Sequence, residues 1–206
     1  QTFVLGFALF ILLGSLLLQL PMSLQPFEQI SFLDAFFTAA SAVCVTGLSV
    51  NDIHDVFSRF GQTIILLLIQ FGGLGIMSFS ILLARLFKSR ISQQASLEYQ
   101  ENFQAFNLKE TFKAIGFLFK LTIVVEMIGA LLIFIFTFER FTTLNDAMFH
   151  SIFHSVSAFC NAGFSLFSDS LVSFYSNTPF ILTISTLIIL GGLGFPIIYN
   201  YIQVLL

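Results

Sequence analysis

The chain has 206 residues, a formal net charge of -3, 57% apolar residues and only 9% charged residues. Ordinary soluble domains contain about 25% charged residues, so this composition excludes a water-soluble fold and favours a protein solvated by lipid. There is no basic stretch that would suggest a nucleic-acid partner, and two cysteines, Cys44 and Cys160, are too few for a disulfide framework.

Four apolar segments reach the length of about 20 residues that a helix needs to cross a bilayer. They are residues 2–20, 60–87, 112–138 and 179–206. We therefore predict four transmembrane helices.

Two shorter apolar runs lie between these segments: residues 32–43 between the first and the second, and residues 147–159 between the third and the fourth. Each run is too short to span and too apolar for a solvated loop, which favours a re-entrant half-helix. Ser31 and Thr143 each precede an aspartate by three residues, as N-terminal capping residues do. We place the two pore half-helices at about 31–43 and 143–159.

The sequence repeats itself. Residues 37–49 align with 153–165 at a constant offset of 116, and Phe, Ser, Ala, Cys, Gly and Ser coincide. A second match, at an offset of 119, is between the Gly-Gly-Leu-Gly motifs at 72–75 and 191–194. These matches predict an all-α integral membrane fold with two M1–P-loop–M2 repeats, as in potassium channels, at residues 1–87 and 112–206.

Basic residues indicate the orientation. Several of them lie in or beside the connector at 88–111, namely Arg85, Lys88, Arg90, Lys109 and Lys113. The positive-inside rule places this connector in the cytoplasm, so both half-helices would enter the membrane from the outside.

A loop follows each half-helix, at 44–49 and at 160–165. The last carbonyls of a helix that ends inside a membrane need partners, and a cation can supply them. Gly47 and Gly163 each follow a cysteine by three residues, and glycine lets consecutive carbonyls face one side. We predict two selectivity filters that bind K⁺ through backbone carbonyls of Cys44, Val45, Thr46, Gly47, Cys160, Asn161, Ala162 and Gly163.

Other polar and small residues receive supporting roles. Glu126 lies well inside the third span and is interpreted as a buried hydrogen-bonded carboxyl or a contact between helices. His150 and His154 have a spacing that suits metal ligands, but packing is favoured because a third ligand is missing. The glycines of the repeated motif are expected to pack against the half-helices rather than act as hinges: Gly72, Gly73, Gly75, Gly191, Gly192 and Gly194.

These motifs resemble the Trk/Ktr/HKT superfamily of potassium transporters, most closely the KtrB-type membrane subunit of bacterial Ktr systems. The residues that carry the resemblance are 41–48, 68–77 and 157–165. Gly47 and Gly163 match the key filter glycines of that family, and a glycine in the first filter goes with potassium selectivity there. The family also implies a homodimer, a cytoplasmic nucleotide-binding ring of RCK type and a bacterial plasma-membrane location.

Family members hold four repeats in one polypeptide, so we expect these two repeats to be the first half of a longer chain. The expected function is potassium uptake, with sodium as a possible coupling ion and with no enzymatic activity. The alternative is a two-pore-type potassium channel that completes its pore by pairing two copies of this chain. Neither loop has the Thr-x-Gly-Tyr-Gly form of ordinary potassium channels, which weighs against that alternative.

Overall fold

The computed structural model describes residues 2–75 and 108–193. In these two ranges the chain is helical, and its only β-structure is an isolated bridge between Leu24 and Phe57. The all-α class predicted from the apolar runs is therefore confirmed for the described residues.

The first range forms a group of three principal helices with two short ones. These are α1 (Thr2–Leu18), η1 (Pro21–Ser23), α2 (Phe32–Val43), α3 (Ile53–Val56) and α4 (Arg59–Gly73). Helix α2 begins with a complete capping box, in which Ser31 Oγ accepts from the Asp34 N–H at 3.1 Å and Asp34 accepts from the Ser31 N–H at 3.3 Å.

The second range repeats this order. It contains α7 (Leu108–Thr137), η2 (Phe138–Arg140), α8 (Leu144–Phe159), η3 (Val172–Phe174) and α9 (Thr178–Gly192). The start of α8 has half of a capping box, because Thr143 Oγ1 accepts from the Asp146 N–H at 3.1 Å but its hydroxyl donates to the Asp146 carboxylate at 2.7 Å. Helix α7 begins inside the predicted connector, since the lysine and glutamate at 109 and 110 are good helix formers. The rest of that connector, residues 88–107, lies outside the described residues.

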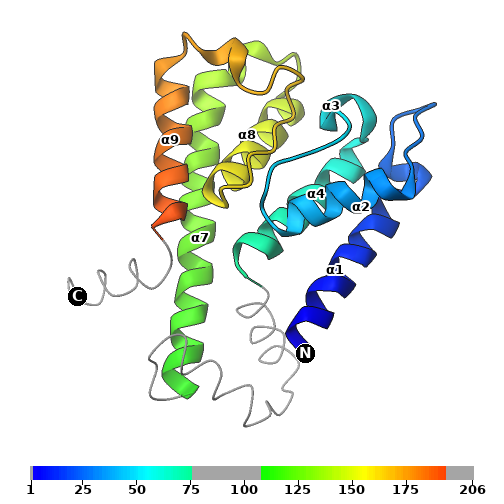
Figure 1. Ribbon diagram of the computed structural model, residues 1–206. Helices are drawn as coiled ribbons and strands as arrows, with labels where there is room; N and C mark the ends of the chain where they lie inside the picture. Colours follow the sequence, from blue (N-terminus) through cyan, green and yellow to red (C-terminus); the bar gives the residue numbers. More distant parts are fainter. Residues whose placement is uncertain (1, 76–107, 194–206) are drawn as a thin grey trace.

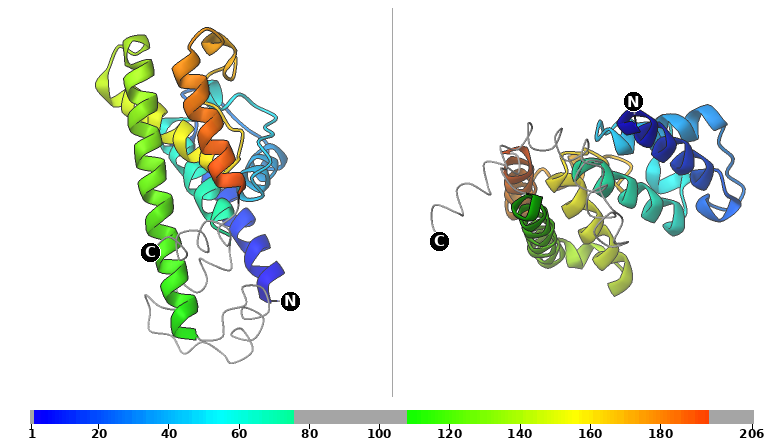
Figure 2. Two further views of the ribbon diagram at one scale, coloured as in Figure 1. Left: turned by 90° about the vertical axis from the view of Figure 1, so that its left-hand side faces the viewer. Right: turned by 90° about the horizontal axis from the view of Figure 1, so that it is seen from below.

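The helices pack as two similar groups. Helix α2 packs on α1 and α4, and α8 packs on α7 and α9. Figure 1 shows α7 and α9 side by side, with α8 slanting toward α7 and ending part of the way along it. The two groups meet mainly where α4 contacts α8, and the view from below in Figure 2 shows them next to each other.

Much of the surface of both groups is apolar. Leu5, Leu33, Met127 and Leu182, among many others, are more than half exposed. Among the described residues one helix, Phe119–Arg140, is long and apolar enough to cross a membrane, and three apolar helices are shorter: Leu5–Leu18, Phe32–Val43 and Thr178–Gly192. The ends of the second and fourth predicted spans, residues 76–87 and 194–206, lie outside the described residues.

Candidate functional site

Helices α2 and α8 end in the same way. The N–H groups of Val45 and Thr46 donate to the carbonyls of Ala42 and Ser41, at 3.2 and 2.9 Å. The N–H groups of Asn161 and Ala162 donate to the carbonyls of Ala158 and Ser157, at 3.0 and 2.7 Å. This pair of bonds is the Schellman motif, which ends a helix at a residue in the left-handed conformation.

The loop backbone is left-handed at alternate positions. In the first loop the φ angles are 57° at Val45 and 75° at Gly47, and in the second they are 59° at Asn161 and 70° at Gly163. Alternation of left-handed residues with others turns successive peptide units the same way, so that their carbonyls can face one side. Two loops with this backbone are suited to surrounding a cation with oxygen atoms.

The two loops touch each other at their glycines. A Cβ atom added to Gly47 would overlap the carbonyl oxygen of Ala162 and would lie 3.1 Å from the Cα of Gly163. A Cβ at Gly163 would lie 3.6 Å from the Cα of Gly47, which is ordinary contact. Of the predicted loop residues, Gly47, Ala162 and Gly163 are therefore brought together between the two helix groups.

The repeated glycines lie directly behind the loops. A Cβ at Gly72 would overlap the carbonyl oxygen of Val43, and a Cβ at Gly191 would overlap the carbonyl oxygen of Phe159. These oxygens belong to the last residues of α2 and α8. A Cβ added to Gly73 would lie 2.5 Å from Cys160 Sγ, so this glycine packs against the cysteine. Of the remaining predicted glycines, Gly75 has a φ of 73°, and a Cβ added to Gly192 would lie 3.8 Å from the side-chain amide of Asn161. Gly194 lies outside the described residues.

Two equivalent serines hold the loops by different hydrogen bonds. Ser41 Oγ accepts from the Leu48 N–H and from the Thr46 hydroxyl, both at 2.8 Å. Ser157 Oγ donates to the Phe164 carbonyl at 2.7 Å. Both serines are buried, so these bonds are shielded from water.

His154 supports the segment that follows the second loop. Its Nδ1 lies 2.7 Å from the His150 carbonyl oxygen, so this nitrogen carries the proton, and Nε2 accepts from the Leu166 N–H at 3.3 Å. Both ring nitrogens are thus used within the fold. Among the described residues no group of three or more histidines, cysteines and acids could hold a metal ion.

Glu126 connects the two helix groups below the second loop. It is 7% exposed, and its Oε1 accepts from Gln70 Nε2 of α4 at 3.0 Å. Cys160 Sγ lies 4.0 Å from the same oxygen, and the Ser155 hydroxyl donates to the Glu126 backbone carbonyl at 2.6 Å. The carboxyl group therefore joins α4, α7 and the end of α8.

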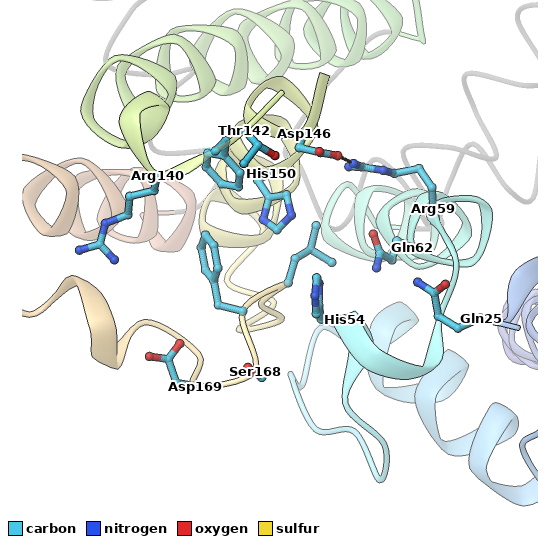
Figure 3. A pocket seen from close by; sticks show the side chains of 13 residues that line it. Gln25, His54, Arg59, Gln62, Arg140, Thr142, Asp146, His150, Ser168 and Asp169 are labelled. Atoms are coloured by element: carbon cyan, nitrogen blue, oxygen red, sulfur yellow. Dashed lines mark hydrogen bonds and ion pairs between the residues drawn. The ribbon is translucent and has the colours of Figure 1, made fainter. Parts of the chain in front are cut away.

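A polar cavity of about 620 Å³ opens between the two groups, beside the N-terminal ends of α4 and α8 (Figure 3). Arg59 reaches across it to form an ion pair with Asp146, and the Arg59 guanidinium lies 4.2 Å from the ring centroid of Phe149. The other polar residues that line the cavity are Gln25, His54, Gln62, Arg140, Thr142, His150, Ser168 and Asp169. Residues 166–169, which directly follow the second loop, line one side of this cavity.

Several supporting residues were not predicted from the sequence. Ser41 and Ser157 had a signal, since they coincide in the internal repeat. Gln70 also had one, because it is a polar residue inside an apolar span, as Glu126 is. The left-handed conformation of Val45 had none, because helices that end this way usually place glycine or asparagine there, as the second loop does with Asn161.

Comparisons with known proteins agree with the resemblance of the motifs. The family model of TrkH, described as a cation transport protein, matches residues 10–205. The chain is 38% identical over 203 residues to the Ktr system potassium uptake protein B of Bacillus subtilis, which covers 98% of this chain and 45% of that protein. It is 39% identical over 195 residues to the potassium/sodium uptake protein NtpJ of Enterococcus hirae, covering 95% of this chain and 43% of that one. The chain spans less than half the length of these relatives.

Proposed function

We propose, from the premise that this chain belongs to the TrkH family of cation transport proteins, that it conducts potassium ions into the cell as part of the ion-translocating subunit of a Ktr/Trk-type system. In this proposal the loops at 44–49 and 160–165 are selectivity filters. The observation that carries the proposal is the left-handed backbone at alternate positions of two loops that touch each other.

The helix ends favour a cation at the same place. Helices α2 and α8 point their C-terminal ends at the two loops, and a helix C-terminus carries about half a negative charge. Carbonyls of Cys44 to Gly47 and of Cys160 to Gly163 would replace the water around a K⁺ ion as it passes. The transport needs no nucleophile or catalytic base, and the chain is not proposed to be an enzyme.

The proposed setting is a bacterial plasma membrane, in which α2 and α8 are re-entrant half-helices of two M1–P-loop–M2 repeats. The exposed apolar side chains of α1, α7 and α9 support this setting, because such a surface is stable against lipid and not against water. The loops are proposed to face outside. Two loops enclose only part of an axis, so a complete pore needs more loops, from further repeats or from a second copy of the chain.

The relatives suggest ions and partners. One of them is named for potassium and one for potassium and sodium, so sodium is a candidate coupling ion. The name "Ktr system" implies several components, and we propose a homodimer with a cytoplasmic nucleotide-binding ring of RCK type. A two-pore-type channel formed by two copies of this chain is the second candidate.

The test is potassium uptake in a bacterial strain that lacks its own uptake systems. Three genes are compared: the full-length gene that contains this chain, the 206-residue segment alone, and the full-length gene with Gly47→Ser. We expect growth at low potassium from the full-length gene, and weaker uptake or sodium entry with Gly47→Ser. Uptake by the segment alone would favour the paired channel. Unchanged potassium and sodium fluxes with Gly47→Ser would refute the filter assignment.

A further inference from the structure

We propose that the side chain of Asn161 is a positioning residue that clamps the second loop to the C-terminal end of α9 and thereby sets the selectivity of that loop. The proposal rests on the proposed function, since it assumes that the loop is a filter. It concerns the carboxamide of Asn161, whereas the filter role concerns the backbone carbonyl of the same residue.

The clamp consists of two hydrogen bonds. With its amide oriented so that both partners are satisfied, Asn161 accepts from the Gly192 N–H at 3.1 Å and donates to the Ile188 carbonyl at 3.2 Å. These two backbone groups are four residues apart and bond to each other in an uninterrupted α-helix. An amide that bonds to both enters the hydrogen-bond ladder of α9, which is a known cause of helix bends.

A neighbouring glycine makes this approach possible. A Cβ at Gly191 would lie 3.1 Å from the side-chain amide of Asn161 and would also overlap the Phe159 carbonyl oxygen. The last turn of α9 is therefore in contact with the end of α8 and with the first left-handed residue of the loop. Displacement of this turn would move the peptide unit of Asn161 with it.

The backbone alone does not explain an asparagine at this position. Asparagine tolerates the left-handed conformation well, and φ is 59° here. The equivalent residue of the first loop, however, is Val45, whose φ is 57° and whose side chain has no polar atom. Since the same conformation is formed without an amide, we assign the amide to the clamp.

The first loop has no counterpart to this clamp among the described residues. At Gly73, which is equivalent to Gly192, the atoms nearest to an added Cβ all belong to Cys160 of the second loop. That contact is close but lacks the direction of a hydrogen bond. Among the described residues, hydrogen bonds from a loop side chain to the last turn of α4 or α9 are therefore found for the second loop only.

Three variants of the full-length protein separate side chain from backbone. Asn161→Gly keeps the left-handed backbone and removes the clamp, Asn161→Asp keeps the acceptor for Gly192 and removes the donor, and Val45→Gly makes the matched change in the first loop. Loss of two hydrogen bonds of ordinary strength predicts that Asn161→Gly lowers the preference for K⁺ over Na⁺ about tenfold, with a smaller loss for Asn161→Asp. The measurement is competitive uptake into vesicles with KM and maximal rate determined separately, because a purely structural defect would lower the maximal rate only.

Amide hydrogen exchange in detergent tests the clamp without transport. In Asn161→Gly we expect faster exchange in the peptide that contains Gly192, and in Val45→Gly we expect unchanged exchange there. Unchanged exchange and unchanged ion preference in Asn161→Gly would overturn the clamp. If the unmodified protein takes up no potassium, the proposed function fails instead, and the exchange experiment still decides whether the clamp exists.

Discussion

The two loops have the same backbone and different supports. Both close their helix with the same pair of hydrogen bonds and both are left-handed at the second and fourth residues counted from the cysteine. The supporting hydrogen bonds differ, because Ser41 Oγ accepts from a loop N–H whereas Ser157 Oγ donates to a loop carbonyl. Asn161 also forms hydrogen bonds to α9, which its counterpart Val45 has no polar side-chain atom to form. The backbone conformation of the loop is therefore the feature shared by the two repeats, and different side chains can stabilise it.

The loops also differ in how far they are covered. Phe164 is 5% exposed and Ala162 is 1% exposed, whereas Leu48, the counterpart of Phe164, is 61% exposed. The difference is confined to these positions, because Asn161 and Gly163 of the second loop are exposed while Val45 and Gly47 of the first are partly buried.

The largest expected difference between the loops comes from their glycines. Gly47→Ala places a Cβ in the carbonyl oxygen of Ala162 and forces the loops apart, so we expect potassium uptake to fall by a factor of about 100 or more. Gly163→Ala meets no such overlap and incurs mainly the left-handed strain of about 1–2 kcal/mol. Uptake of rubidium tracer by both variants, normalised to protein in the membrane, measures this. Equal losses would show that the contact between the loops is unimportant.

A smaller effect is expected below the second loop. Glu126→Leu leaves the partly buried Gln70 amide without its acceptor, at a cost of about 1–3 kcal/mol, whereas Glu126→Gln keeps an oxygen at that position. We expect a lower thermal unfolding midpoint in detergent for the leucine variant than for the glutamine variant. The exchanged pair, Gln70→Glu with Glu126→Gln, should unfold near the midpoint of the unmodified protein, because it can form the same hydrogen bond with the partners reversed. A midpoint as low as that of the leucine variant would mean that the two side chains do not act together.

The serines should differ less, and in a defined order. Ser41→Ala deprives the Leu48 N–H of its acceptor, while the Thr46 hydroxyl keeps the Ser41 carbonyl at 3.3 Å. Ser157→Ala instead leaves one donor missing at the Phe164 carbonyl. Unsatisfied buried N–H groups are tolerated less well than carbonyls. We therefore expect Ser41→Ala to lose about 1 kcal/mol more stability than Ser157→Ala, measured by unfolding in detergent. The reverse order would contradict the hydrogen bonds described here.

The smallest effect, and a favourable one, is expected at Val45. A β-branched residue is unfavourable at a φ of 57°, and asparagine is accepted there in the second loop. Val45→Asn should stabilise the protein by about 0.5–1 kcal/mol through relief of strain, seen as a higher unfolding midpoint. A lower midpoint would show that burial of the valine side chain outweighs the strain.

The sequence predicted the helical class and the starts of α2 and α8, because both depend on local patterns. Apolar runs place helices, and Ser31 and Thr143 carry start signals that need only a few neighbours. The clamp of Asn161 and the junction at Gln70 and Glu126 could not be predicted in the same way. They join residues about 30 and 56 positions apart, and their geometry depends on how close glycines allow two helices to approach.

The duplicated glycine contacts also show where the chain has changed in length. The carbonyls of Val43 and Phe159 are related by an offset of 116, whereas the glycines they touch, Gly72 and Gly191, are related by 119. The first residues of α4 and α9, Arg59 and Thr178, already have the larger offset. The three additional residues therefore lie in the segment 166–177, where Tyr175 is 81% exposed. Because the two repeats differ in length at this segment and keep the same glycine contacts, it is the position at which an epitope tag or a fluorescent label should be added.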